Sequence, residues 1–537
     1  MPGRLTKAAL VSCLAACTGT VTPPGTSAPP PGQQTTEFAS ASGARRLSQV
    51  ELDSTLADLL QDDSRRALAL NSDEYTPFDN DITTQQASMT LITNLEIMAH
   101  QIATQVVDDP TRRDAVVPCT PTGPGDADCL RQFIETWAPR ALRRPVTDDE
   151  VDAYMTLQSF ATEDNPDVDN DFYTAVRLII AAVLQDPEFL YRIERGTERD
   201  DRPGVFALDG FELATRLSYL ITGSTPDAVL LADAASGALD TADGRRAAAE
   251  RLLDTPDART QIHRFHAMWL GHRILAQPPE LVAAFNRETG ALIDRVVFEE
   301  DRPYTDVFTA DETYLDDFLA DHYALPHPTG GEGWVPYGDS GRGGGILSHG
   351  SLLAAFAKFA DTSPTQRGIL IRTRLMCQTI PPPPASVNVD DPPVNTDNLC
   401  KVEQYAAHRN QSGCSGCHSQ MDPLGFGLEN FDMAGRYRDH DEGRPECPID
   451  GVGEVPGLGT FRGPGELGQR LVDEQIIDAC ALEQYYQFAT GRPVLPIDAQ
   501  VIDGLVDDFR AAQLSLRGII LSYVASERFA HRREEAL

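Results

Sequence analysis

The residues best suited to chemistry are two cysteines and a histidine in the segment Cys414-Ser415-Gly416-Cys417-His418. This C-x-x-C-H spacing is typical of covalent c-type haem attachment. Residues three apart on a helical turn share a face, so both thiols can form thioethers with the haem vinyl groups while the adjacent imidazole coordinates the iron. The spacing therefore predicts one haem c, attached through Cys414 and Cys417, with His418 as its proximal ligand.

Three other uses of the same residues are open: a redox disulfide, a zinc site built from Cys414, Cys417 and His418, and a purely structural disulfide. A thioredoxin-like redox pair needs a βαβ context, which the surrounding pattern lacks. Exported thiols tend to oxidise rather than hold zinc. Haem attachment is therefore the preferred interpretation, and a structural disulfide is the main alternative.

The second axial ligand decides which chemistry a haem performs. A His/Met pair suits electron transfer at raised potential, whereas an open position binds or activates a small ligand. Met421 follows His418 by three residues, so we expect it on the same side of the haem, as a packing residue. No methionine follows Met433, although small cytochromes c usually place theirs well downstream. The candidates for the distal ligand are Met433, His440, His408 and Met376.

Two arginines after the motif, Arg436 and Arg438, are candidate partners of the haem propionates, because a guanidinium matches the geometry of a carboxylate. The alternative is a pair of surface arginines.

The N-terminus resembles that of a bacterial lipoprotein. Arg4 and Lys7 precede an apolar stretch over residues 8–16 that is too short to span a bilayer. Leu14-Ala15-Ala16-Cys17 is similar to a lipobox, which predicts removal of residues 1–16 and a lipid on Cys17. In Gram-negative lipoproteins, an Asp after the lipidated cysteine commonly retains the protein at the inner membrane. Thr18 occupies that position here, so the resemblance favours release to the outer membrane. The alternative is an ordinary secretory signal, and no other segment approaches the ~20 apolar residues of a membrane helix.

The cysteines of an exported chain are expected to form structural disulfides. Of the ten, Cys13 leaves with the signal, Cys17 takes lipid, and two belong to the C-x-x-C-H motif. The remaining six are Cys119, Cys129, Cys377, Cys400, Cys447 and Cys480. Fifteen pairings of six cysteines are possible. Proximity along the chain suggests the pairs Cys119–Cys129, Cys377–Cys400 and Cys447–Cys480.

Charge and composition limit the classes of partner that the protein could bind and the regions that could fold. A net charge of −36 argues against binding to nucleic acid or to anionic lipid surfaces, and an acidic, solvated exterior explains it. Residues 18–44 are rich in Thr, Ser, Pro and Gly and cannot bury a core, so they are expected to form a disordered tether. The rest is long enough for three or four domains.

Most periodic segments after the tether have helical spacing, and strand signals are scarce. The expected fold class is all-α, with several packed helical units, long Gly/Pro-rich loops such as 326–345, and a disulfide-stapled C-terminal region. Helices are expected at 84–107, 172–184, 210–221, 244–253, 259–269 and 280–298. The expected segments are a signal peptide (1–16), the tether (17–44), helical domains at 45–110, 111–195 and 196–325, a cysteine-rich domain with the motif (346–463), and a C-terminal helical domain (464–537).

The region 414–438, from Cys-Ser-Gly-Cys-His to Gly-Arg-Tyr-Arg, resembles the signature of a family built from serial domains of unknown function, of the DUF1592 and DUF1588 type with companion domains. Such proteins abound in planctomycete and myxobacterial envelopes and often accompany cytochrome c domains. Other segments agree in the same order along nearly the whole mature chain: Arg45-Arg46-Leu47-Ser48, Phe78-Asp79-Asn80, Arg143-Arg144-Pro145, Phe189 to Glu194, Leu213 to Leu220, Ser363 to Gly368, and Ala489 to Arg492. The resemblance implies the family and brings no settled activity.

Other motifs add little. His263 and His266 could share a helix face, but core or capping roles are the simpler interpretation. No G-x-S-x-G elbow or phosphate-cradling loop is present. The leading hypothesis is a monohaem envelope lipoprotein that exchanges electrons with a redox protein partner. The alternatives are a non-catalytic surface protein, acting in adhesion or macromolecule handling, whose Cys414 and Cys417 form a disulfide, and a haem enzyme with an open iron position.

Overall fold

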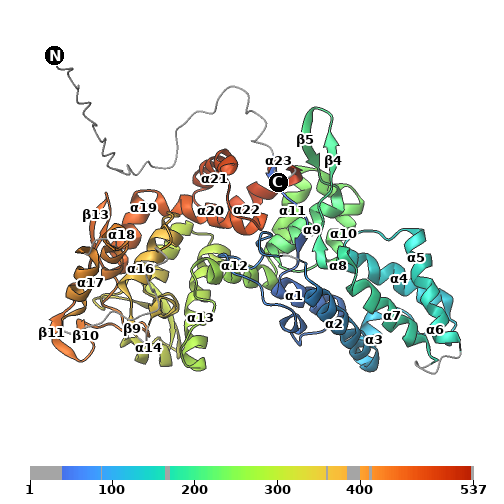
Figure 1. Cartoon of the computed structure of the whole chain (residues 1–537), viewed down its shortest axis with the longest axis horizontal. Coiled ribbons are helices and arrows are strands. Elements are labelled where there is room, and N and C mark those ends of the chain that lie inside the picture. Colours follow the sequence, from blue (N-terminus) through green and yellow to red (C-terminus); the bar gives the residue numbers. More distant parts are fainter. Residues whose placement is uncertain are drawn as a thin grey trace, which may run out of the picture. The chain divides into compact units, whose positions relative to one another are not determined.

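The computed structural model describes residues 39–85, 87–163, 170–358, 361–383, 399–410 and 414–533. The predicted signal peptide, Cys17 and all but the end of the predicted tether lie outside these residues. Helices dominate the described chain (Figure 1). Among the described helices, none combines the length and the apolar character that a bilayer crossing requires.

The N-terminal helices enclose their own apolar core, which runs from Leu47 to Leu190 and includes Tyr219. Ser48 and Glu51 form a capping box that starts the first helix, and Thr147 and Glu150 form another before the fifth. The helices of this part are α1 (Gln49–Leu60), α2 (Met89–Asp108), α3 (Pro110–Val116), α4 (Ala127–Leu142), α5 (Asp148–Met155), α6 (Ser159–Thr162), α7 (Phe172–Leu184) and α8 (Pro187–Leu190).

A second core joins the central helices to the C-terminal ones, with buried residues from Leu208 to Phe529. In Figure 1 α22 lies beside α11, and the two are in contact. The central helices are α9 (Gly210–Ile221), α10 (Ala228–Ala235), α11 (Ala242–Leu253), α12 (Pro256–Trp269), α13 (Pro279–Asp294) and α14 (Asp317–Tyr323). Those that follow are α15 (Gly350–Ala355), α16 (Pro364–Leu370), α17 (Lys401–Asn410), α18 (Ser415–Phe426), α19 (Gly463–Asp473), α20 (Ile476–Thr490), α21 (Ala499–Ala511), α22 (Leu516–Ala525) and α23 (Glu527–Ala530).

The fold is mainly helical, with small sheets that the all-α expectation omitted. The largest, in the order β1-β14-β5-β4, joins both ends of the described chain to a central hairpin. The strands are β1 (Ser40–Ala41), β2 (Arg45–Arg46), β3 (Tyr191–Arg192), β4 (Thr197–Arg199), β5 (Arg202–Ala207), β6 (Glu312–Asp316), β7 (Glu332–Pro336), β8 (Ala357–Lys358), β9 (Asp361–Thr362), β10 (His440–Asp441), β11 (Arg444–Pro448), β12 (Val452–Val455), β13 (Gly459–Arg462) and β14 (His531–Arg533).

Two of these strands fall where none was expected. β7 lies inside the Gly/Pro-rich stretch 326–345 and pairs antiparallel with β6, so part of that stretch is sheet and not loop. β1 lies at the end of the segment expected to be a tether. Both strands are five residues or shorter, and a period of two is hard to recognise over so few positions.

The predicted helices at 172–184 and 210–221 are confirmed at both ends. The helix expected from residue 84 begins later, at Met89, because Ser88 caps it. Before that cap, Asp81 accepts hydrogen bonds from the N–H and the hydroxyl of Thr83, which stabilises a turn.

The disulfides confirm one predicted pair and correct two. Cys119–Cys129 is present, but Cys377 bonds to Cys480 and Cys400 bonds to Cys447. The expectation failed because it used distance along the sequence. In the fold α20, which carries Cys480, packs against the helical turn that ends before Cys377, and the two Cα atoms lie 5.3 Å apart.

Candidate functional site

The motif occupies the first turn of α18. The backbone N–H groups of Cys417 and His418 both donate to the carbonyl oxygen of Cys414, at 3.3 and 3.1 Å. This turn sets the two thiols one helical turn apart, as thioether formation requires. Both cysteines are free and half-buried, although the six other described cysteines are all paired.

The imidazole of His418 is oriented by a buried carboxylate one turn further along the helix. Its Nδ1 lies 3.1 Å from both carboxylate oxygens of Asp422, which is fully buried. Asp422 also accepts a hydrogen bond of 2.7 Å from the hydroxyl of Thr365. With Nδ1 donating to a carboxylate, the imidazole lone pair is on Nε2. A carboxylate that accepts from the other ring nitrogen is the usual support of a metal-binding histidine.

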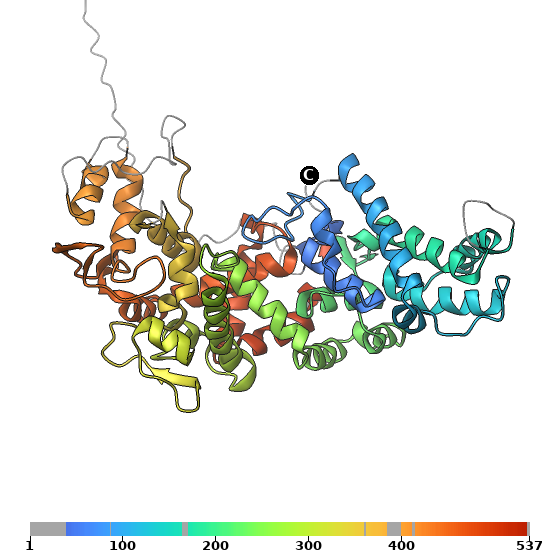
Figure 2. The same cartoon turned by 90° about the horizontal axis from the view of Figure 1, so that it is seen from below.

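Close packing against α16 fixes the position of α18. The two helices lie side by side in both views (Figures 1 and 2). A Cβ on Gly368 would come within 1.9 Å of the carbonyl oxygen of Met421, and one on Gly425 within 1.8 Å of that of Pro364. Only glycine allows this approach. Met421 is itself 5% exposed, which confirms it as a packing residue.

The distal-ligand candidates lie in separate surroundings. Met376 belongs to the apolar core. Met433 is half-buried after α18, and its carbonyl oxygen accepts from the side chain of Gln277 at 2.9 Å. His440, on β10, is 43% exposed at its side chain and lies 2.5 Å from Asp439. The side chain of His408 lies outside the described part. The distal ligand therefore remains a prediction.

The two arginines expected near the propionates have protein partners. Arg438 pairs with Glu429 at 3.0 Å, and Arg436 pairs with Asp432 at 2.8 Å. Glu429 is almost fully buried and also binds Arg367 at 3.0 Å. These carboxylates neutralise both arginines, so Arg436 and Arg438 form part of the protein's own ion pairs.

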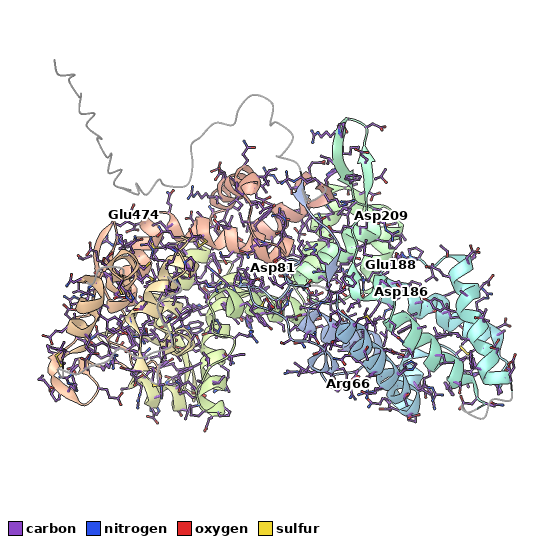
Figure 3. All side chains as sticks on the ribbon, viewed as in Figure 1. Arg66, Asp81, Asp186, Glu188, Asp209 and Glu474 are labelled. Atoms are coloured by element: carbon purple, nitrogen blue, oxygen red, sulfur yellow. A yellow bond between two sulfur atoms is a disulfide. The ribbon has the colours of Figure 1, made fainter. Side chains whose placement is uncertain are left out.

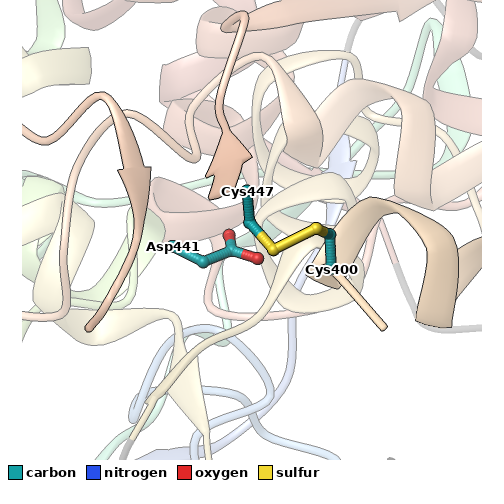
Figure 4. Close-up of side chains that lie close together, drawn as sticks. All are labelled: Cys400, Asp441 and Cys447. Carbon is teal, nitrogen blue, oxygen red and sulfur yellow. A yellow bond between two sulfur atoms is a disulfide. The ribbon is translucent and has the colours of Figure 1, made fainter. Parts of the chain in front are cut away.

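One further cysteine group resembles a metal site by proximity alone. The sulfur atoms of Cys400 and Cys447 lie close to a carboxylate oxygen of Asp441 (Figure 4). The two sulfurs are joined in a disulfide, so they offer no thiolates. Asp441 instead accepts from the backbone N–H of Lys401 at 2.8 Å. The group is therefore a structural disulfide beside a hydrogen-bonded carboxylate.

A buried titratable cluster that no sequence motif marks surrounds Glu288 on α13. Glu288 accepts hydrogen bonds of 2.7 Å from the hydroxyls of Thr313 and Tyr323, and its carboxylate lies 3.8 Å from Nε2 of His349. Burial raises the pKa of Glu288 to about 7 and lowers the pKa of His349 to about 3. Burial also lowers the pKa of His272 to about 4. These residues are scattered over some eighty positions, so no local pattern could have shown them.

His263 and His266 have separate structural partners on α12, in line with the simpler interpretation of these two histidines. His266 is buried, its Nδ1 donates to the carbonyl of Ile262 and its Nε2 accepts from the hydroxyl of Tyr304 at 2.5 Å. His263 instead binds Asp294 at 2.9 Å. Burial lowers the pKa of His266 to about 3. Both histidines therefore have structural partners.

Segments that carry the family resemblance meet in one buried ion network. Glu194 lies between Arg45 and Arg216, at 3.0 and 2.5 Å. Burial alone would raise the pKa of Glu194, but the two guanidinium groups outweigh it and hold that pKa well below its usual range. Arg45 also donates to the carbonyl of Ala489 at 3.1 Å. The network fastens the N-terminal, central and C-terminal parts together.

A cavity of about 210 Å³, lined in part by charged residues, adjoins this network. Arg144 and Glu188 line it and form an ion pair of 2.6 Å. Asp209 also lines it; Glu188, in α8, and Asp209, just before α9, are labelled in Figure 3. Asp209 caps α9 through the backbone N–H groups of Phe211 and Glu212. Ion pairing and capping explain these side chains without a ligand.

Five family models match the chain in series. In chain order their descriptions are Protein of unknown function (DUF1587) over residues 45–108, (DUF1595) over 129–194, (DUF1592) over 208–325, (DUF1588) over 342–441 and (DUF1585) over 459–529. The C-x-x-C-H motif lies inside the DUF1588 match. No curated protein and no solved structure matches the chain.

Proposed function

Since this chain belongs to the planctomycete-type family of serial domains of unknown function, we propose its function from its own site: a monohaem c-type envelope protein that exchanges electrons with a redox partner. The observation that carries the proposal is the pair of free thiols one turn apart on α18, followed by an imidazole whose Nδ1 lies against a buried carboxylate.

The residues present fit a covalently attached haem. Cys414 and Cys417 remain free in a chain whose other described cysteines are oxidised. This is unlike a purely structural C-x-x-C disulfide and supports a thioether role. With Nδ1 placed against the Asp422 carboxylate, Nε2 is the ring nitrogen that would coordinate the iron. A bound haem would supply a one-electron redox couple, whose potential depends on the axial ligands and their hydrogen bonds.

The chain's own residues would set the strength of the proximal ligand. The buried carboxylate of Asp422 orients the His418 ring and makes the imidazole a stronger electron donor. Thr365 in turn holds Asp422 in place from α16. Rigid packing of α16 on α18 keeps this arrangement fixed, which suits electron transfer because little reorganisation accompanies a change of charge.

We further propose that Cys17 carries a lipid that anchors the protein in the envelope, on the outer membrane. The lipobox-like Leu14-Ala15-Ala16-Cys17 supports this. Metabolic labelling with an alkyne fatty acid tests it. The wild-type chain should take up the label and fractionate with membranes, whereas Cys17→Ala should do neither. Equal labelling of both proteins would reject the anchor.

Haem staining of denaturing gels tests the cofactor. The full chain is produced in a bacterial host with cytochrome c maturation machinery, together with Cys414→Ser/Cys417→Ser and, as a matched control, Cys119→Ser/Cys129→Ser. We expect staining of the wild type and of the control, and none of the motif variant. Staining that persists without both motif cysteines would contradict attachment there. A wild type that never stains would favour a non-catalytic surface protein.

A further inference from the structure

An arginine beside the motif is buried without a carboxylate partner. Arg372 lies in the helical turn Ile371–Leu375 that follows α16, and it is 8% exposed. Its Nη1 donates to the carbonyl oxygen of Gln420 at 3.3 Å, two residues after His418 on α18. Its Nε has no hydrogen-bond partner, and no ion pair joins Arg372 to any carboxylate in the part of the chain that the structure describes. Burial lowers its pKa, with no opposing contribution from an acidic group.

Neighbouring arginines have the carboxylate partner that Arg372 lacks. Arg367, five residues earlier on α16, binds Glu429, and Arg438 binds the same carboxylate. Arg436 has Asp432. A guanidinium taken out of water without an anion is costly. The burial of Arg372 next to α18 is therefore explained if an anion from outside the polypeptide lies against it.

We propose that Arg372 binds a propionate carboxylate of the haem attached at Cys414 and Cys417. The inference rests on the proposed function. Vinyl groups and propionates lie on opposite edges of the porphyrin, with the iron between them. Along α18, both cysteines precede His418 and the Gln420 carbonyl that Arg372 binds follows it, an order that matches vinyl groups, iron and propionates across the porphyrin. Arg372 replaces Arg436 and Arg438 in this role, since those two are already neutralised.

The test is the reduction potential of holoprotein variants. Removing a buried cation beside a propionate stabilises the more positive, oxidised haem. We therefore expect Arg372→Gln to lower the equilibrium constant for haem reduction about tenfold, which is about 59 mV for one electron. Arg372→Lys should recover most of the difference. Arg436→Gln is the matched control and should leave the potential unchanged.

The outcomes separate the two proposals. A wild type without covalent haem defeats the proposed function itself. A haem-loaded Arg372→Gln protein with the wild-type potential overturns the role of Arg372, as does an equal shift in Arg436→Gln. If Arg372→Gln does not fold, the propionate bending band in resonance Raman spectra tests the contact instead. The band should move in Arg372→Lys and stay unmoved in Arg436→Gln. An unmoved band in both variants overturns the proposal.

Discussion

Replacing His272 with leucine should change how many protons the protein takes up when it unfolds. The His272 ring is 6% exposed, and neither of its nitrogens has a hydrogen-bond partner in the described structure. Burial lowers its pKa from 6.5 to about 4. Leucine fills a similar volume without a titratable group, so the variant removes the proton-binding site and keeps the packing.

The size of the effect follows from the two pKa values. At about pH 5.2 the ring is about 95% charged in the unfolded chain and about 5% charged in the folded one, so unfolding takes up about 0.9 proton through this residue. Because its folded pKa is lowered, the stability that His272 contributes is fully present above pH 6.5. That stability is lost as the pH falls toward 4, by about 3 kcal/mol in all.

Other buried groups act over the same range, and a comparison of two proteins separates them. His266 and His349, each with a pKa lowered to about 3, add to the loss of stability in acid. Glu288, with its pKa raised to about 7, acts in the opposite direction: its contribution is present below pH 4.5 and lost as the pH rises through 7. These contributions are common to the wild type and to His272→Leu, so they cancel in the difference.

Potentiometric titration measures proton uptake directly. Each protein, with its disulfides intact, is unfolded in urea at constant pH, and the acid needed to hold the pH is recorded. We expect His272→Leu to take up about 0.9 proton fewer than the wild type at about pH 5.2, and the same number above pH 8. Equal uptake at about pH 5.2 would refute the claim that burial keeps His272 neutral.

Three further variants test other parts of the account. Asp422→Asn should raise the reduction potential of the holoprotein, because an amide strengthens His418 as an iron ligand less than a carboxylate does. Spectroelectrochemistry measures the potential, and an unchanged value at equal haem content would contradict the role of Asp422. Loss of Cys377–Cys480, which closes a loop of 103 residues, should cost about 4 to 5 kcal/mol and lower the melting temperature more than loss of Cys119–Cys129; the reverse order would argue against this pairing. Glu194→Gln leaves Arg45 and Arg216 buried without their anion and should destabilise the fold by about 3 to 5 kcal/mol in thermal unfolding, and a loss below about 1 kcal/mol would argue against a buried network.

Local signals in the sequence predict the helices well. Capping residues such as Asp209 and Thr147 have their effect within four positions, so they could be recognised without a fold. The apolar face of α7 was equally plain. The strands β1 and β7 could not be found this way, because pairing with distant segments, and not local preference, holds them in place.

The site was predictable only in its local part. Cys414, Cys417 and His418 stand together in the sequence, and so does Asp422 one turn later. The support from Thr365, the unpaired Arg372 and the Cys377–Cys480 disulfide all depend on contacts across 48 or more residues. Proximity along the chain misassigned two disulfides for the same reason.

Intact mass of the purified full chain from a host that matures c-type cytochromes, with pyridine haemochrome absorbance on the same sample, tests covalent haem attachment without intermediate steps. We expect one covalently bound haem for each chain, three disulfides, and a haemochrome spectrum of a haem with both vinyl groups saturated. A mass that fits disulfides alone, with no haemochrome band, would contradict it.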